Sequence, residues 1–359
     1  MSETAQLKEV LRLLPGPAFF TDGQTATWCN DACRQIPLEK GDKILSLLGR
    51  SLSLYRQRSE ESVAGFPVEA GSEIYSATVR RVGEEDLFLL QQQRPEDTSR
   101  LRSVAAAIHP ALSTLLSVGS RLFPELEEAE DEATQTKTAA LQQACFQLLR
   151  TVRSLRFFDR IVTSPQSLAL RRTDLTAMLG ELAAKTAEML RDARIDLTAD
   201  LPAKPVWGCV DSSSVAYAVL QLISNAAAFC GDDRQIELTA AESGRWLRIR
   251  VADHGAEMPQ DILATAFSSA DPGSDTDIRR GAGLGLPIVQ AVARRHGGSA
   301  VIESGKAGTA VTMTLDLTLA AEVELRAPCN DLSVGYDDAL IELSRILPPE
   351  TYDSRNIDL

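Results

Sequence analysis

The stretch that decides the fold is Gly281-Ala282-Gly283-Leu284-Gly285-Leu286, and the apolar run LPIVQAVARR continues from it over residues 286–295. Alternating glycines allow positive φ angles and let the backbone approach an anionic group closely. Apolar residues at helical spacing after them predict a helix that begins at the glycines. The N-terminus of such a helix presents free N–H groups and a partial positive charge, which suits phosphate. A flexible loop before a helix is the alternative interpretation of the glycines alone.

Other motifs flank the glycines in a fixed order. Asn225 lies in the apolar helical stretch LQLISNAAAFC, and Asp253-His254-Gly255 follows an alternating strand. Phe267 precedes a polar stretch, residues 268–280, and the glycine helix is followed by His296-Gly297-Gly298 and then Gly308-Thr309. No apolar strand leads into the glycines, which excludes a dinucleotide-binding turn.

This order of motifs resembles the ATP-binding domain shared by sensor histidine kinases, gyrase, Hsp90 and MutL. The resemblance covers about residues 170–320, and residues 280–315 are specific to the histidine-kinase branch. It implies an α/β-sandwich domain that binds ATP and Mg²⁺, with the polar stretch 268–280 as a mobile lid over the triphosphate. Arg279 or Arg280 would neutralise phosphate charge.

Each site residue also has a chemical reason for its role. Asn225 offers a neutral carbonyl oxygen, a hard ligand for the Mg²⁺ that bridges the phosphates. Asp253, at the end of a strand, would accept a hydrogen bond from the adenine amino group, and Thr309 would approach the adenine side. The full set that the resemblance implies is Asn225, Asp253, Gly255, Gly281, Gly283, Leu284, Gly285, Leu286 and Thr309, with Asn225 as the metal ligand.

Three positions refine this interpretation. Hydrolytic relatives place a general-base Glu four residues before the Mg²⁺ Asn, on the same helix face. This chain has Gln221 there, which cannot take a proton and therefore disfavours a gyrase-like or Hsp90-like ATPase. Glu257 replaces a glycine of the family, and Ala228 replaces a basic residue, so both changes disfavour triphosphate.

Composition sets the wider limits. The chain has 359 residues, a formal net charge of −13 and 24% charged residues, which argues against a nucleic-acid or anionic-membrane partner. No apolar run is long enough to span a membrane, and the N-terminus lacks a signal pattern, so we expect a cytoplasmic protein. The six cysteines are scattered and form no tetrahedral metal pattern.

The predicted fold class is a multidomain α+β protein. Residues 1–93 resemble a PAS-type α/β sensor, because PAFFTDGQTATWCNDACRQI predicts strand, turn, strand and helix. Residues 97–163 form two helices with apolar seams at alternating spacings of four and three, which predicts a helical hairpin that dimerises as a four-helix bundle. Residues 170–320 form the ATP-binding domain. Residues 321–359 form an acidic tail, in which 337–347 predicts a short docking helix stopped by Pro348 and Pro349.

A histidine kinase needs an exposed phosphoacceptor histidine on the first bundle helix. His109, in AAAIHPALSTLL, is the candidate, because His254 and His296 lie in the nucleotide motifs. Two registers remain open. In one, His109 is the phosphoacceptor and Pro110 takes the place of the acidic base. In the other, which fits the apolar pattern better, Ala106 occupies the phosphoacceptor position.

Two functions follow from the resemblance. The first is a dimeric sensor histidine kinase that phosphorylates itself from ATP and passes phosphate to the receiver domain of a separate response regulator. The second is a degenerate kinase that binds nucleotide and signals by conformation or dimerisation.

Overall fold

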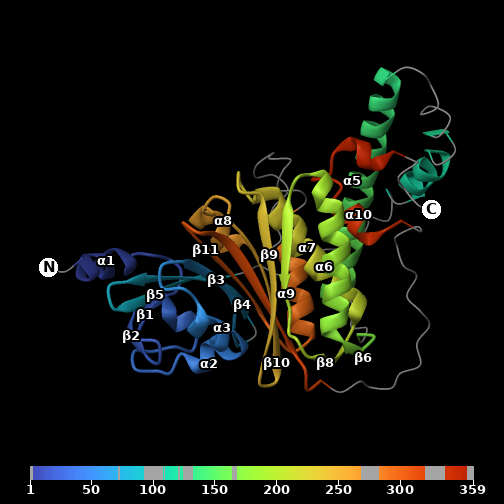
Figure 1. Ribbon diagram of the computed structural model, residues 1–359. Helices are drawn as coiled ribbons and strands as arrows, with labels where there is room; N and C mark the ends of the chain where they lie inside the picture. Colours follow the sequence, from blue (N-terminus) through green and yellow to red (C-terminus); the bar gives the residue numbers. More distant parts are fainter. Residues whose placement is uncertain are drawn as a thin grey trace.

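The computed structural model describes residues 3–71, 73–92, 108, 110–119, 122–123, 132–163, 168–267, 283–319 and 336–353. No helix in these ranges has both the length and the apolar character needed to cross a bilayer. Figure 1 shows the N-terminal strands on one side of the molecule and the long helices α5, α6 and α7 on the other.

The N-terminal unit is a five-stranded antiparallel sheet with short helices, in the order β2-β1-β5-β4-β3. The predicted strand, turn, strand and helix over the first third of this unit are present, with Asp22 closing the turn through its bonds to the Gln24 and Thr25 amides. Large aromatic side chains fill its core, and Phe19 stacks on Phe88 with ring centroids 4.6 Å apart. The elements are α1 (Glu3–Leu11), β1 (Ala18–Thr21), β2 (Ala26–Cys29), η1 (Asp31–Gln35), α2 (Leu45–Leu48), η2 (Gly49–Ser51), α3 (Leu52–Gln57), β3 (Val63–Ala70), β4 (Glu73–Val82) and β5 (Glu85–Gln92).

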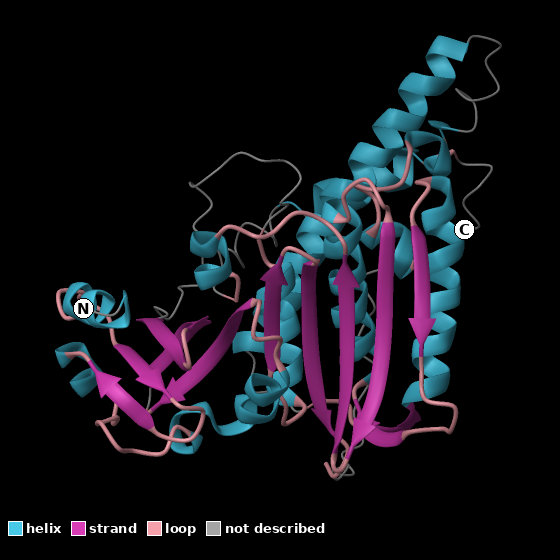
Figure 2. Cartoon of the chain, turned by 60° about the vertical axis from the view of Figure 1, so that its left-hand side comes forward, coloured by secondary structure: helices cyan, strands magenta, loops and turns pink. Residues whose placement is uncertain are grey.

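The second unit packs helices on one face of a sheet ordered β11-β12-β10-β9-β7 (Figure 2). Along β10 the apolar residues Leu247, Ile249 and Val251 are buried against the helices, and Arg248 and Arg250 alternate with them on the opposite face. The elements are β6 (Arg171–Asp174), α6 (Leu175–Asp192), β7 (Asp196–Asp200), β8 (Trp207–Val210), α7 (Ser212–Phe229), β9 (Gln235–Ser243), β10 (Trp246–Asp253), α8 (Gln260–Thr265), α9 (Gly285–Arg295), β11 (Ala300–Gly305) and β12 (Gly308–Asp316).

The two units share one ten-stranded sheet, because β3 pairs with β11 in antiparallel register. Gly65 lies opposite Ile302, and a Cβ at this glycine would stand 2.9 Å from the Ile302 methyl group. Val301 turns the other way and joins the apolar core of the N-terminal unit. The ladder removes the free edge that each sheet would otherwise expose.

The helix α5 (Glu132–Thr163) matches the second helix of the predicted hairpin. Its predicted seam divides into two faces: Cys145 and Val152 are buried, whereas Leu141 and Leu148 are 54% and 50% exposed. The buried face packs against the second unit, where Arg295 of α9 donates to the Ile161 carbonyl. Of the first hairpin helix only residues 108, 110–119 and 122–123 are described, and all are helical. Leu115 and Val118 are about half exposed there, so apolar side chains of both helices are available for a partner.

The C-terminal segment, which we define as residues 336–353, lies against α5, α6 and α7. The predicted docking helix over 337–347 is too long: α10 (Asp338–Glu342) ends five residues earlier, and η4 (Pro349–Tyr352) follows. Two side chains of α5 donate hydrogen bonds to backbone carbonyl groups that follow the end of α10. Gln147 donates to the Ser344 carbonyl, and Gln143 donates to the Leu347 carbonyl. These bonds hold residues 344–347 against α5.

Candidate functional site

Helix α7 places Asn225 at the edge of the helix layer. Asp211 caps its N-terminus by accepting from the Ser214 amide, and a nearly continuous apolar sequence buries the helix against the sheet. Asn225 is half-buried one helical turn after Gln221, which is 1% exposed. The two amide side chains therefore lie on one face of the helix.

Asp253 stands at the end of β10, directly opposite Thr309 on β12. Its Oδ1 accepts from the Gly255 amide at 2.9 Å and from the Thr309 amide at 3.4 Å. None of the described residues bonds to Oδ2, so that oxygen is available to a ligand. Burial raises the pKa of this carboxyl, and the two backbone hydrogen bonds only partly offset that rise. The site thus offers a fixed, largely desolvated acceptor, which is what recognition of an amino group requires.

Two glycines allow the chain to close tightly around Asp253. A Cβ at Gly255 would stand 1.7 Å from the Phe229 carbonyl oxygen, at the end of α7. Gly308 has φ +113°, and a Cβ there would stand 2.0 Å from the Asp253 carbonyl oxygen. Any side chain at either position would therefore push α7 or β12 away from the carboxylate.

The glycine hinge begins α9 beside Asn225. Gly283 has φ +66°, Leu284 is buried, and no side chain caps the helix, so its first N–H groups have no intrahelical partner. A Cβ at Gly285 would lie 3.1 Å from Asn225 Nδ2 and 3.0 Å from Gln221 Oε1. The helix N-terminus and the metal-ligand candidate are therefore neighbours, the arrangement that a phosphate–metal group needs.

The structure brings most of the predicted residues together. Asn225, Asp253, Gly255 and Thr309 line one region, and Gly283, Leu284, Gly285 and Leu286 form the adjoining hinge. Gly281, His109, and the lid at 268–280 with Arg279 and Arg280 lie outside the described residues.

His296 has a structural place. It is fully buried, its Nδ1 lies 2.8 Å from the Val292 carbonyl, and its Nε2 accepts from the Asp211 amide at 3.1 Å. Burial lowers its pKa, which keeps the ring neutral and able to donate at one nitrogen and accept at the other. The ring thus joins the end of α9 to the start of α7.

Sequence reasoning missed the residues that contact Asn225. Arg345 Nη2 donates to Asn225 Oδ1 at 3.0 Å, and Gln221 Nε2 donates to Glu342 Oε2 at 2.6 Å. The amphipathic pattern of 337–347 indicated a docking helix, but no local signal identifies the surface that such a helix will cover.

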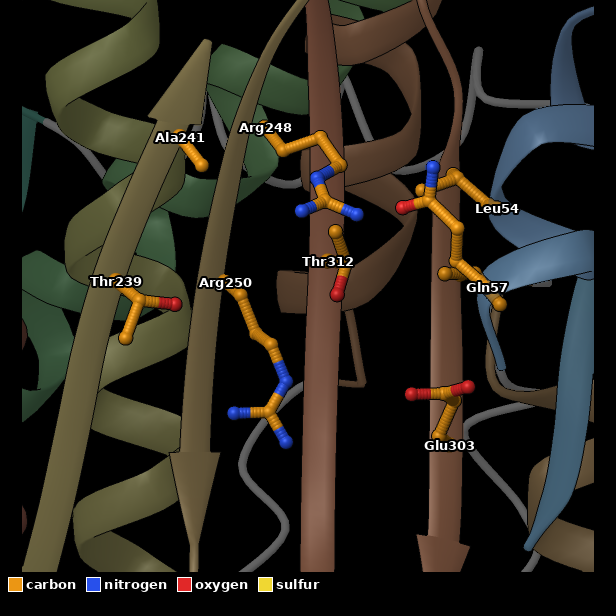
Figure 3. A pocket seen from close by; sticks show the side chains of 9 residues that line it. Leu54, Gln57, Thr239, Ala241, Arg248, Arg250, Glu303 and Thr312 are labelled. Carbon is orange, nitrogen blue, oxygen red and sulfur yellow. The ribbon is translucent and has the colours of Figure 1, made fainter. Parts of the chain in front are cut away.

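A cavity of about 120 Å³ lies on the opposite face of the sheet, between β9–β12 and α3 (Figure 3). Arg248 and Arg250 lean from β10 toward β12, with Gln57 and Glu303 on the far side. Thr309 and Asp253 face the helices, whereas Thr312 and Arg250 pair on the other face. The cavity is therefore separate from the Asp253 region.

Comparison with known proteins agrees with this geometry. Residues 210–319 match the family model described as "Histidine kinase-, DNA gyrase B-, and HSP90-like ATPase". The histidine protein kinase DivJ of Caulobacter vibrioides is 36% identical over 133 residues, which cover 36% of this chain and 22% of that protein. The sensor histidine kinase ZraS of Escherichia coli is 28% identical over 242 residues, or 66% of this chain and 49% of that protein.

Among solved structures, full-length ShkA in complex with AMPPNP superposes with a TM-score of 0.48 at 21% identity, covering 62% of this chain and 47% of that one. The matched part of this chain spans only about a fifth of the length of DivJ and about half of the length of ZraS. The prediction of a histidine-kinase-type ATP-binding domain is confirmed by the family match and by relatives that are themselves protein histidine kinases.

Proposed function

We propose, from the histidine-kinase-type ATPase domain at residues 210–319, that this chain is a sensor histidine kinase of a two-component system. It would bind ATP with Mg²⁺, phosphorylate a histidine and pass the phosphate to a separate response regulator. The observation that carries the proposal is the convergence of Asn225, the buried Asp253 carboxylate and the uncapped start of α9 around one region.

Nucleotide recognition would divide between the two ends of this region. Oδ2 of Asp253 would accept from the adenine amino group, while Oδ1 stays bonded to the Gly255 and Thr309 amides. The N–H groups at Gly285 and Leu286 would bind phosphate oxygens. The adenine and the triphosphate would then lie on opposite sides of the C-terminal half of α7.

Mg²⁺ fits this site as a metal held mainly by phosphate. The described residues contain no group of three His, Cys, Asp or Glu side chains that could hold a metal. Mg²⁺ accepts one or two protein oxygens together with substrate phosphates and water, and Asn225 Oδ1 would be the protein ligand. When bound, the ion supplies neutralisation of the triphosphate charge.

Gln221 supports phosphoryl transfer to a side chain over hydrolysis. An amide cannot take a proton from water, so the position lacks a general base. Its Nε2 is also bonded to Glu342, and that carboxylate is in turn bonded to Arg150. We therefore propose that the site transfers the phosphoryl group of ATP to a side chain and not to water.

The remaining parts would supply dimerisation and sensing. The exposed seam residues of α5, including Leu141 and Leu148, support pairing of two hairpins as a four-helix bundle. The N-terminal unit of 1–93 would act as a PAS-type sensor, joined to the ATPase sheet by the β3–β11 ladder.

Incubation with labelled ATP and Mg²⁺, followed by acid and base treatment, tests the proposal. We expect acid-labile, base-stable label on the protein that is lost in His109→Ala. His109→Gln serves as a matched variant of similar size. Label that survives in both variants would show that His109 is not the acceptor, and no label with wild-type protein would contradict kinase activity.

A degenerate kinase is the second function, and the Arg345–Asn225 hydrogen bond favours it. In that case nucleotide would bind and change the conformation without phosphorylation. The degenerate kinase is distinguished from the first function by two results together: nucleotide raises the midpoint of thermal unfolding, and no label is transferred to the protein.

A further inference from the structure

The C-terminal segment is built into the domain rather than appended to it. Ile341, Leu343 and Tyr352 are fully buried, and the Tyr352 ring lies 4.9 Å from that of Phe146 on α5. Tyr352 also donates to the Leu340 carbonyl at 2.9 Å, which closes the segment on itself. Burial of several large apolar side chains of this kind gives the segment a stable docked state.

Polar contacts tie the segment to α5 and to the site face of α7. Glu342 is fully buried; its carboxylate accepts from Gln221 at 2.6 Å and from Arg150 of α5 at 3.1 Å. Its backbone carbonyl accepts from Ser224 Oγ at 3.0 Å. The segment therefore connects α5 with the turn of α7 that carries the nucleotide-site amides, as Figure 1 shows for α10.

Arg345 completes this contact at the metal-ligand position. Its Nη2 donates to Asn225 Oδ1 at 3.0 Å and to the Ser224 carbonyl at 3.2 Å. The guanidinium group of Arg345 is a cation with N–H donors and no acceptor. A guanidinium and Mg²⁺ cannot both take the same amide oxygen at contact distance, since two cations there repel each other.

We propose that the C-terminal segment is an intramolecular inhibitor that competes with Mg²⁺–ATP for Asn225. The inference rests on the proposed nucleotide-binding function. With the segment docked, Arg345 holds the metal-ligand oxygen and α10 stands between α7 and α5, the helix that follows the phosphoacceptor region. Activation then requires the segment to leave, and ATP binding and segment docking weaken each other equally.

Arg345→Ala tests the competition by equilibrium titration with ATP and Mg²⁺. We expect the Kd for Mg²⁺–ATP to fall about tenfold or more, because a hydrogen bond to a charged donor no longer has to be broken. The affinity for adenosine, which does not reach Asn225, should stay unchanged. Lys185→Ala is the control: it removes only the outer ion pair to Asp337 and should leave both affinities unchanged.

A second readout uses wild-type protein and does not depend on a variant that folds. Hydrogen exchange at residues 337–352 should become faster on addition of Mg²⁺–ATP, whereas an ordinary ligand slows exchange. Equal Mg²⁺–ATP affinity in wild type and Arg345→Ala, with no faster exchange, would overturn the inference and leave the proposed function intact. No binding of ATP or adenosine to either protein would overturn the proposed function itself, and the inference with it.

The cavity on the other face of the sheet is lined by two arginines of β10, Arg248 and Arg250. Arg248 forms no ion pair or hydrogen bond within the described part of the chain, and Arg250 lies near the carboxylate of Glu303, the one acidic residue that lines the cavity. Two guanidinium groups against one carboxylate leave an excess positive charge. Leu54 and Gln57 of α3 cover the same cavity, so a ligand there would touch both units.

The geometry points to a binding site for a small anion, phosphate or a short dicarboxylate, between the N-terminal unit and the ATPase sheet. Thr239 and Thr312 line the floor and offer hydroxyl groups beside the arginines. Guanidinium groups bind phosphate and carboxylate through paired N–H donors. A volume of about 120 Å³ is large enough for a ligand of this size.

Thermal unfolding in inorganic phosphate or malonate, against chloride at matched ionic strength, tests this site. We expect a saturable rise in midpoint for wild type, and at least a tenfold loss of apparent affinity in Arg248→Gln. Gln57→Glu, an exposed change, should weaken binding by adding negative charge. An equal rise in wild type and both variants would assign the anion to another place, such as the start of α9, and would overturn the inference, as would no rise at all.

Discussion

Replacing Asp253 by Asn changes one atom at the position that we propose to select the base. In the structure Oδ1 accepts two backbone N–H groups, so the amide oxygen keeps that place and the new NH₂ group replaces Oδ2. An adenine amino group would then meet a donor instead of a charged acceptor. A hydrogen bond to a charged group contributes about 1.5–3 kcal/mol, so ATP affinity should fall about 10- to 150-fold.

The same change should alter base selectivity. Guanine carries a carbonyl oxygen where adenine has its amino group, so the wild-type carboxylate repels it and the Asn side chain can donate to it. We therefore expect wild type to prefer ATP over GTP and Asp253→Asn to lose that preference. Calorimetric titration with both nucleotides measures the two affinities directly.

Stability provides the control for this experiment. Burial raises the pKa of Asp253, which means that the folded protein holds the carboxylate less favourably than the unfolded chain does at neutral pH. The Asn variant should therefore be at least as stable as wild type without ligand. Glu237→Gln, an exposed change on β9, should leave both affinities unaltered. Unchanged ATP and GTP affinities in Asp253→Asn would refute the assignment of base recognition to this residue.

Two further predictions concern the framework of the site. Gly255→Ala should destabilise the fold by about 1–3 kcal/mol in urea unfolding, because its Cβ would stand 1.7 Å from the Phe229 carbonyl oxygen; a change below about 0.5 kcal/mol would contradict that close approach. His296 should make stability fall as pH drops below 6.5, since its folded pKa is lowered by burial and the unfolded chain takes up the proton first. The expected slope is at most about 1.4 kcal/mol per pH unit, and urea unfolding at pH 7.5 and 5.5 should show a smaller difference in His296→Gln than in wild type.

The sequence predicted the parts of the site that depend on local geometry. Gly283, at φ +66°, occupies a conformation that favours glycine, and a Cβ at Gly285 would make a tight contact of 3.1 Å with Asn225 Nδ2. The alternating pattern before Asp253 also predicted a strand that ends there, and β10 does end at Asp253. Such features follow from backbone sterics and from side-chain periodicity, which a single sequence contains.

Contacts between distant segments could not be predicted in this way. The β3–β11 ladder joins residues 63–65 to 302–304, and no pattern within either strand identifies its partner. The contact of Arg345 with Asn225 spans 120 residues and depends on where α10 docks. The helix predicted over 337–347 was also too long, because α10 ends at Glu342 and the residues after it are held against α5 by Gln143 and Gln147.

Titration of the whole chain with ADP and ATP, with and without Mg²⁺, tests the central claim most directly. The account predicts saturable one-to-one binding of both nucleotides, a gain in ATP affinity with Mg²⁺ that Asn225→Ala abolishes, and tighter binding in Arg345→Ala. No measurable binding of either nucleotide at millimolar concentration, in wild type and in Arg345→Ala alike, would contradict it.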